Sequence, residues 1–402
     1  MNLDKLREAE IKFGNPLYVY DLSIIENKFN ELSNAFKKIK NFKIHYAVKS
    51  LSNISILKFI KELGAGLDTV SIEEVKIGLN CGFNNKDITF TPNGVSFEEI
   101  EEAYNLKVNI NIDSLESLKD FSNKYSSYPI SIRINPNILA GGNKNVSVGH
   151  SESKFGIPES HLDEIVEMEN QNKIQIQGVH IHTGSDIVKL DKFEKAFKKI
   201  FSISNKFKNI KVLNFGGGLK VPYFDGDSKT NISDLSKLIQ RLINENNIVK
   251  YKDPKIILEP GKFLVGESGY FLTKVNYIKK THNKVFIQLN TGFNHFIRPT
   301  LYNSFHEIVN ISNPNDKEHE YDVVGYICEQ DNFAINRKIS KVRKGDILCF
   351  KNSGAYCFSM SSNYNSRRKA AEVCINKNKI LKIRDRENFD DILLGQIDIF
   401  NI

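Results

Sequence analysis

The sequence lacks several features that mark particular classes of protein. No apolar run approaches the ~20 residues that a membrane-spanning helix needs, so we expect no membrane association. The opening residues, MNLDKLREAEIKFG, are charged almost at once and contain no apolar stretch typical of a secretory signal. The five cysteines are odd in number and show no CxxC spacing, which argues against a disulfide framework or a zinc site. We therefore expect a cytoplasmic protein without a metal site.

Nucleic-acid binding is not indicated either. The net charge is only +8, and the lysines fall mostly on expected helix surfaces such as KFEKAFKKIF. No basic patch carries interleaved aromatic residues, which a nucleic-acid interface would be expected to show. A mildly positive field suits an anionic small substrate or a phosphorylated cofactor equally well. The sequence thus favours a small-molecule partner and no nucleic acid.

What the sequence does contain is a regular alternation of strand-like and helix-like segments over residues 21–263. The helix expected after Asp21 places Ile25, Phe29, Leu32 and Phe36 on one face. Strands that alternate with helices imply a parallel sheet, and eight such units over ~240 residues fit a (β/α)8 barrel. An open doubly wound sheet is the alternative. The eight strand-like runs are 43–49, 67–70, 87–91, 108–113, 129–136, 174–184, 211–218 and 255–261.

The pattern changes near residue 264. Runs such as LTKVNYIKK, KVFIQLNTG and GDILCFKN are strand-like and separated by turns, as in an antiparallel β domain. The chain is long enough for two domains, so we expect the barrel at 21–263 and a β domain formed by 1–20 together with 264–402. The loop 137–153 is rich in glycine and asparagine, and loops of this length are usually functional, so it could cover a substrate.

Polar groups collect at the carboxyl ends of the expected barrel strands, where active sites of such barrels lie. In strand order they are Lys49, Asp68, His180 with His182, Gly216–Gly218, and Glu259. Ordinary structural interpretations exist for these groups. Lys49 could be a strand end that reaches water, and His182 a histidine satisfied in the core. Gly216–Gly218 could be a tight turn without a ligand, and Glu259 could form a salt bridge inside the barrel. Together, an amine, an anion-binding glycine turn and a carboxylate match what pyridoxal phosphate (PLP) requires.

Nine motifs carry a resemblance to a known family. They are YAVKSLSN, GAGLDTVSIEE, GHSESKFGI, HIHTGSDI, NFGGG, EPGK, IRPTLY, CEQDNF and GAYCFSMSSNYNSR. They follow the order found in the barrel-type PLP-dependent amino-acid decarboxylases, and they span nearly the whole chain. The sequence most closely resembles the members of that family that act on meso-2,6-diaminopimelate.

The resemblance implies roles for individual residues. Lys49 forms the Schiff base with the cofactor and Cys328 donates a proton during catalysis. Cofactor binding is implied for Lys49, Asp68, His182, Ser185, Gly217, Gly218, Glu259, Gly261, Lys262 and Tyr356, with His182 stacked on the ring and Glu259 facing the pyridine nitrogen. Substrate binding is implied for Lys262, Arg298, Tyr302, Glu329 and Tyr356, with Glu329 pairing with the distal ammonium.

The resemblance also implies an activity and an assembly. The expected reaction is decarboxylation of meso-diaminopimelate to L-lysine and CO2, the last step of lysine biosynthesis. In this family Cys328, Glu329 and Tyr356 would come from the neighbouring subunit, so the active unit is expected to be a homodimer. Two departures from the family pattern concern specificity: Lys262 replaces the usual arginine, and CEQDNF replaces a Cys-Glu-Ser motif.

Alternative functions remain at this stage. One is a decarboxylase of lysine, ornithine or a related diamino acid, although Arg298 favours a substrate with a distal carboxylate. A racemase with the same barrel would lack the CE and SMSSNYNSR motifs. A non-catalytic PLP-binding protein is expected to lose the proton donor or the cofactor contacts, which this sequence retains.

Overall fold

The computed structural model describes residues 2–138, 149–150, 152–246 and 253–400, which fold into two compact units. The first, here called the barrel unit, comprises Glu26–Pro222 and Gly226–Leu264. The second, here called the β unit, comprises Met1–Ile25, Tyr223–Asp225 and Val265–Ile402. Nowhere in the described part of the chain does a helix combine the length and the apolar character that spanning a membrane requires.

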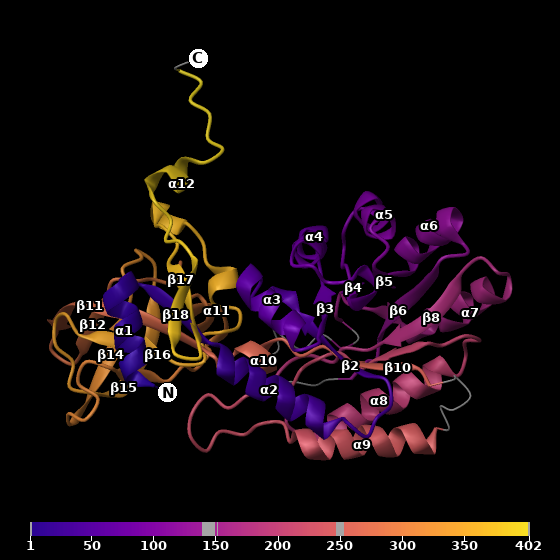
Figure 1. Cartoon of the computed structure of the whole chain (residues 1–402), viewed down its shortest axis with the longest axis horizontal. Helices are drawn as coiled ribbons and strands as arrows, with labels where there is room; N and C mark the ends of the chain where they lie inside the picture. The colour runs from indigo at the N-terminus through magenta and orange to yellow at the C-terminus, as the bar shows by residue number, and fades with distance from the viewer. Residues whose placement is uncertain (1, 139–148, 151, 247–252, 401–402) are drawn as a thin grey trace. The chain divides into compact units, whose positions relative to one another are not determined.

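The barrel unit is built on eight parallel strands that close on themselves (Figure 1). Strand β10 pairs with both β9 and β2, and β5 pairs with β6, so neither edge of this sheet is open. The predicted (β/α)8 barrel is therefore confirmed, and the open doubly wound sheet is wrong. The strands are β2 (Phe42–Ala47), β3 (Gly66–Thr69), β4 (Ile88–Phe90), β5 (Asn109–Ile112), β6 (Pro129–Asn135), β8 (Gln175–His180), β9 (Val212–Asn214) and β10 (Lys255–Leu258).

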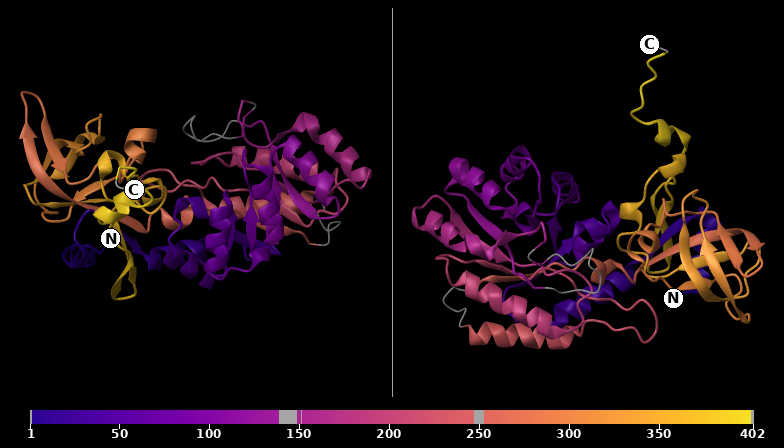
Figure 2. Two further views of the ribbon diagram at one scale, coloured as in Figure 1. Left: turned by 90° about the horizontal axis from the view of Figure 1, so that it is seen from above. Right: turned by 180° about the vertical axis from the view of Figure 1, so that it is seen from behind.

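Helices cover the outside of the barrel strands, as the views in Figure 2 show. Serine side chains cap three of them: Ser71, Ser96 and Ser114 each accept a hydrogen bond from a backbone N–H of the first turn. The helices are α2 (Leu22–Ala35), α3 (Ile54–Glu62), α4 (Ile72–Asn80), α5 (Phe97–Asn105), α6 (Leu115–Tyr125), α7 (Leu162–Asn170), α8 (Leu190–Ser204), α9 (Ile232–Glu245) and the short α10 (Lys262–Val265). A two-residue strand, β7 (Ile157–Pro158), pairs with β6.

All eight barrel strands end earlier than their sequence pattern predicted, and in two of them the difference concerns a predicted site residue. β2 stops at Ala47, so Lys49 lies in a one-turn 3-10 helix, Val48–Ser50, rather than at the end of the strand. β8 stops at His180, so His182 follows the strand instead of belonging to it. Both apolar runs continue into the turns that leave the barrel, and apolar pattern alone does not show where strand pairing ends. Of the loop predicted at 137–153, residues 139–148 and 151 lie outside the described residues.

The β unit contains one nine-stranded sheet. Most of its pairs are antiparallel, as predicted, but β1 pairs with β17 and β12 pairs with β14 in parallel, so the sheet is mixed. Its strands are β1 (Leu17–Asp21), β11 (Gly269–Lys280), β12 (Val285–Leu289), β13 (Ile308–Asn310), β14 (Glu318–Val324), β15 (Asn332–Ser340), β16 (Ile347–Phe350), β17 (Ala371–Asn376) and β18 (Lys379–Arg384). The helices are α1 (Leu3–Phe13), α11 (Arg298–Tyr302) and α12 (Phe389–Leu393).

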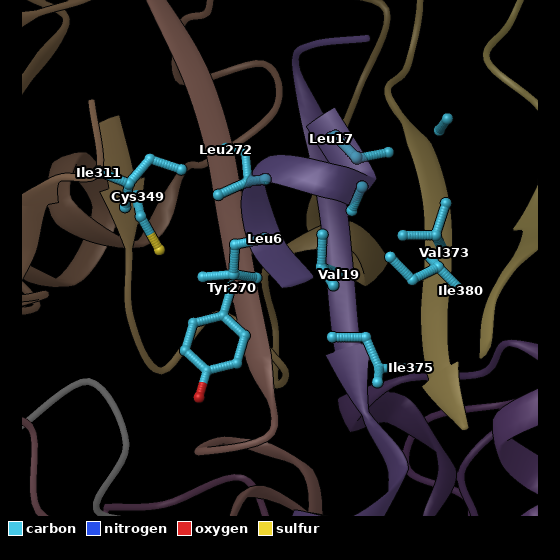
Figure 3. Packing of buried hydrophobic residues seen from close by; sticks show 12 residues of the cluster. Leu6, Leu17, Val19, Tyr270, Leu272, Ile311, Cys349, Val373, Ile375 and Ile380 are labelled. Atoms are coloured by element: carbon cyan, nitrogen blue, oxygen red, sulfur yellow. The ribbon is translucent and has the colours of Figure 1, made fainter. Parts of the chain in front are cut away.

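An apolar cluster around β1 holds the β unit together (Figure 3). Leu17 and Val19 of β1 are fully buried between Leu272 of β11 and Val373 of β17. Leu6 of α1 adds to the same cluster. Burying each such side chain contributes about 1.5–3 kcal/mol, so the N-terminal strand is an integral part of this sheet.

Candidate active site

Lys49 stands at the carboxyl end of the first barrel strand. The 3-10 turn Val48–Ser50 follows β2 directly. The backbone N–H of Ala47 donates to the carbonyl of Pro260 at 3.4 Å, so the end of β2 lies against the segment that follows β10. The Lys49 side chain is exposed in this chain. Its amine is thus accessible at the rim where the barrel strands end.

Glu259 is buried just after β10, and side chains from β8 and β9 hold its carboxylate. Its Oε2 atom lies 3.1 Å from Nε2 of His180, and the two side chains are only 5% and 3% exposed. The side-chain amide of Asn214, the last residue of β9, donates to Oε1. Burial alone would raise the pKa of Glu259, but the interactions with His180 and the Asn214 hydrogen bond lower it to about 2. The carboxylate therefore stays ionised at neutral pH.

His180 is oriented by a further buried amide. The Nδ2 atom of Asn111 on β5 lies 2.7 Å from Nδ1 of His180 and donates to it. With Nδ1 accepting, the imidazole proton is assigned to Nε2, which faces Glu259. Polar side chains from three barrel strands thus fix the position and the charge of one carboxylate.

The glycine run after β9 forms a tight turn beside His182. Gly216 and Gly218 have φ angles of +65° and +99°, a region that favours glycine. The Gly217 N–H donates to Nδ1 of His182 at 3.1 Å, which assigns the remaining ring proton to Nε2. Burial lowers the pKa of His182 well below 6.5, so the ring is neutral at pH 7. A Cβ at Gly217 would lie 2.4 Å from the carbonyl oxygen of Glu259, so the two segments pass this closely only with glycine.

Asp68 on β3 is a second buried carboxylate at this rim. Burial and the negative charge of Glu259 raise its pKa well above the ordinary aspartate range, and the positive charge of Lys49 opposes that rise. Its Oδ1 atom is buried and has no hydrogen-bond partner within the described residues. A buried polar atom of this kind is costly unless something pairs with it.

Lys262 forms a nearly buried ion pair on the same rim. Its Nζ atom lies 2.5 Å from Oδ1 of Asp186, and the side chains are 9% and 28% exposed. Asp186 directly follows the half-buried Ser185 and has a φ angle of +59°. Next to Lys262, a Cβ at Gly261 would lie 2.1 Å from Oγ of Ser50, so this glycine allows close approach to the turn that carries Lys49.

These residues fit pyridoxal phosphate. An exposed amine, an ionised buried carboxylate and an unpaired buried oxygen meet at one rim. The backbone N–H groups of Gly218 and Gly261 donate to no acceptor in the described part of the chain, and such groups suit a phosphate. The set therefore offers each group that the cofactor requires: an amine, an anion-binding turn and a negative partner for its ring nitrogen.

The β unit carries the remaining predicted residues. Arg298 at the start of α11 is 6% exposed, and its guanidinium donates to the hydroxyl of Tyr223 at 2.9 Å and contacts Nε2 of His306 at 3.2 Å. Tyr302 ends the same helix and is half-buried. Tyr356 is also half-buried and has a left-handed φ of +59°. The guanidinium is thus fixed in place, as a group that recognises a carboxylate should be.

Cys328 and Glu329 lie in an exposed loop of the β unit. The thiol of Cys328 donates to Oε2 of Glu329 at 3.3 Å, and the hydroxyl of Tyr364 donates to Oε1. The loop is anchored by Asp331, whose buried carboxylate accepts the N–H groups of Ile327 and Phe293. Asp331 is the aspartate of CEQDNF, the motif that differs from the usual family pattern, and its role in this motif is structural.

The structure groups the predicted residues by unit. The barrel unit brings together Lys49, Asp68, His182, Ser185, Gly217, Gly218, Glu259, Gly261 and Lys262, and the β unit carries Arg298, Tyr302, Cys328, Glu329 and Tyr356. Sequence reasoning assigned no role to Asn111, Asn214, Asp186 or Asp331. A signal for Asn214 was available, because it is an amide within the otherwise apolar run VLNF, where a polar side chain needs a buried partner.

Comparisons with known proteins show the family to which the chain belongs. The family model described as "Pyridoxal-dependent decarboxylase, pyridoxal binding domain" matches residues 22–266. The chain is similar to the diaminopimelate decarboxylase of Methanothermobacter thermautotrophicus, with 35% identity over 97% of this chain and 93% of that protein. It is also similar to the diaminopimelate decarboxylase of Helicobacter pylori, with 36% identity over 96% of each chain.

Solved structures extend the comparison. The Methanocaldococcus jannaschii diaminopimelate decarboxylase in complex with L-lysine matches with a TM-score of 0.90 and 30% identity, over 98% of this chain and 94% of that one. A lysine/ornithine decarboxylase from Vibrio vulnificus matches with a TM-score of 0.80 but only 20% identity, over 93% of this chain and 96% of that one, and so shares the fold. The chain belongs to the diaminopimelate decarboxylases, within the family of pyridoxal-dependent decarboxylases.

Proposed function

We propose that this protein removes one carboxylate of meso-2,6-diaminopimelate and releases L-lysine and CO2, with pyridoxal phosphate as cofactor. The observation that carries the proposal is the buried, ionised Glu259 at the same barrel rim as Lys49. When bound, the cofactor supplies the electron sink for the pair of electrons that CO2 leaves behind. The choice of substrate is supported by the full-length similarity to diaminopimelate decarboxylases, and the enzymes of two species were solved in complex with L-lysine.

Residues of the barrel unit hold the cofactor. Lys49 supplies the amine that anchors it, and Glu259 keeps a negative charge opposite its ring nitrogen. The neutral ring of His182 provides a flat, uncharged face. Asp68 is a further cofactor contact, and its unpaired oxygen supports that role. The phosphate is held by Ser185 and by the backbone of Gly217, Gly218, Gly261 and Lys262, the last with its charge shared with Asp186.

Residues of the β unit recognise the substrate and move the proton. Arg298, with Tyr302, binds a substrate carboxylate, and its buried position supports that role because a fixed guanidinium gives a directional bidentate contact. Glu329 pairs with the distal ammonium. Cys328 transfers the proton on Sγ to the carbon that has lost CO2. Tyr356 contributes to binding both the phosphate and the substrate.

The active unit is a homodimer in which Cys328, Glu329 and Tyr356 of one subunit complete the site of the other. The family resemblance supports this arrangement, as does the exposure of Cys328 and Glu329 in the isolated chain. The barrel at 21–263 and the β domain at 1–20 with 264–402 are the two parts that each subunit contributes. All five cysteines are free and four are buried, which supports a reducing, cytoplasmic location.

A subunit-mixing experiment tests the shared site. Lys49→Ala and Cys328→Ala would each be inactive or very slow alone. If sites are shared in a dimer, random mixing places one intact site in each heterodimer, and about a quarter of the wild-type activity returns. Mixtures that stay as inactive as the separate variants, with exchange of subunits verified by mass, would refute shared sites.

A substrate competition tests the reaction itself. The PLP-loaded protein is given meso-diaminopimelate, L-lysine and ornithine separately, and CO2 release is measured for each. We expect meso-diaminopimelate to react fastest, because only it offers Arg298 a distal carboxylate. Faster release from L-lysine or ornithine would overturn the assignment of substrate.

A further inference from the structure

Cys328 is one member of a short chain of hydrogen bonds formed by Tyr364, Glu329, Cys328 and Asn365, here called the thiol chain. The Cys328 thiol donates to Oε2 of Glu329 at 3.3 Å. On its other side, the side-chain amide of Asn365 donates to the Cys328 sulfur at 3.4 Å. The hydroxyl of Tyr364 donates to the remaining carboxylate oxygen, Oε1. The sulfur is therefore both a donor and an acceptor, and each oxygen of Glu329 accepts one hydrogen bond.

The two loops that form the thiol chain are tied to common supports. The ring of Tyr364 stacks on Phe293, with centroids 5.5 Å apart and an angle of 23°. The N–H of Phe293 donates to Asp331 at 2.8 Å, in the loop that carries Cys328. Asn365 has a φ of +57°, a left-handed conformation that asparagine tolerates well. Packing and turn geometry thus aim the amide at the sulfur.

This arrangement creates a competition at Glu329. In the proposed function the carboxylate binds the distal ammonium of the substrate, yet in the free chain its Oε2 atom already accepts the thiol proton. An ammonium is a stronger partner for a carboxylate than a thiol, because its hydrogen bond is assisted by charge. Arrival of the distal ammonium would therefore displace the S–H group from Glu329.

We infer that Glu329 restrains the thiol proton of Cys328 until the distal ammonium of the substrate takes its place, and that Asn365 is a positioning residue for the sulfur. The inference rests on the proposed function. In the released state the S–H bond breaks and a C–H bond forms at the carbon that has lost CO2, using the electron pair left there. The sulfur keeps the S–H pair as a thiolate, which the Asn365 amide stabilises, and water then returns the proton.

The reactivity of the Cys328 thiol can be measured without catalytic turnover. Cys328 is exposed in the isolated chain, and in the proposed dimer it faces a site that the substrate must enter, so iodoacetamide should reach it, whereas Cys81, Cys349, Cys357 and Cys374 are buried. Within one chain, Glu329 contacts the thiol directly and Tyr364 acts through Glu329, and in the proposed dimer the charged groups of the other subunit's barrel site are the same in every variant compared. The midpoint of the alkylation rate against pH is then compared between variants of the holoenzyme, with Cys328→Ala as the control for site.

Two variants should move that midpoint in opposite directions. Asn365→Gly removes the donor without straining the left-handed turn, so the thiolate loses a hydrogen bond and alkylation near the midpoint slows about threefold or more. Glu329→Gln removes the negative charge beside the sulfur, so the thiolate forms more readily and alkylation quickens by a similar factor. Asn336→Gly makes the same change at another exposed left-handed asparagine outside the thiol chain and should leave the midpoint unchanged. Shifts of the two test variants in the same direction, or no shift, would overturn the inference.

Single-turnover experiments separate this inference from the proposed function. With meso-diaminopimelate, the wild-type protein should release CO2 and then form lysine after a short lag. In Asn365→Gly the lag should lengthen about threefold to tenfold while CO2 release changes less than about twofold. 2-Aminopimelate lacks only the distal amino group. With this substrate, the lag between CO2 release and formation of the decarboxylated product should lengthen by a similar factor in the wild-type protein. If the wild type makes no lysine at all, the proposed function fails; if it does and neither lag lengthens, this inference alone fails.

Discussion

The substitution Gly218→Ala tests whether the glycine turn after β9 holds a phosphate. At this position the φ angle is +99°, and an added Cβ would lie 2.4 Å from the carbonyl oxygen of Gly184. A left-handed alanine costs about 1–2 kcal/mol. The overlap adds about 1–3 kcal/mol, because backbone on one side or the other must move. The free energy of unfolding should therefore fall by about 2–5 kcal/mol.

Gly226→Ala is the matched control. It also has a positive φ, +81°, but a Cβ there meets nothing within 4 Å, so only the conformational cost of about 1–2 kcal/mol applies. Urea unfolding of both variants without cofactor measures the difference. Equal losses would show that the contact with Gly184 is not what requires glycine at 218.

Cofactor affinity is the functional part of this prediction. Moving the Gly218 N–H away from a bound phosphate loses a charge-assisted hydrogen bond worth about 1.5–3 kcal/mol, which weakens PLP binding roughly 10- to 100-fold. Pyridoxal, which lacks the phosphate, should bind within about twofold of its wild-type affinity, as measured by absorbance titration. An equal loss of affinity for PLP and pyridoxal would refute a phosphate site at this turn.

Two further predictions concern stability. His45 is buried with its Nδ1 atom 3.1 Å from the hydroxyl of Thr89, and burial lowers its pKa to about 4. Below pH 6.5 the unfolded chain binds a proton on His45 and the folded chain does not, so the free energy of unfolding falls as the pH drops from 6.5 to 4. His45→Gln should remove about 3 kcal/mol of that fall, as measured by urea unfolding at several pH values. An unchanged pH profile in this variant would contradict the prediction. For the pair Lys262 and Asp186, Lys262→Met and Asp186→Asn should each destabilise, and the double variant should lose about 1–2 kcal/mol less than their sum. Strictly additive losses would show that the pair is not coupled.

Much of the barrel could be predicted because its signals are local. Apolar runs of strand length alternate with amphipathic helices, and the rule for strand ends then places Lys49, Asp68 and Glu259 on one rim before any contact is known. The helix face of Ile25, Phe29, Leu32 and Phe36 is buried as its spacing predicted.

The rest depends on pairings that no local pattern specifies. The parallel partner of β1 is β17, more than 300 residues away in the sequence, and strand alternation indicates which face is buried but not which strand lies alongside. The ion pair of Lys262 with Asp186 is similar in kind, because their loops meet only in the closed barrel. The motif SMSSNYNSR contributes to the family resemblance, but only the structure brings its Asn365 to Cys328.

The most direct test of the central claim is the product formed from meso-diaminopimelate. The protein is incubated with PLP and this substrate, and CO2 and L-lysine are quantified together. We expect the two products in equal amounts from the wild-type chain, and neither product nor cofactor-linked absorbance from Lys49→Ala. Full turnover by Lys49→Ala, or CO2 without L-lysine from the wild type, would contradict a PLP-dependent diaminopimelate decarboxylase that uses Lys49.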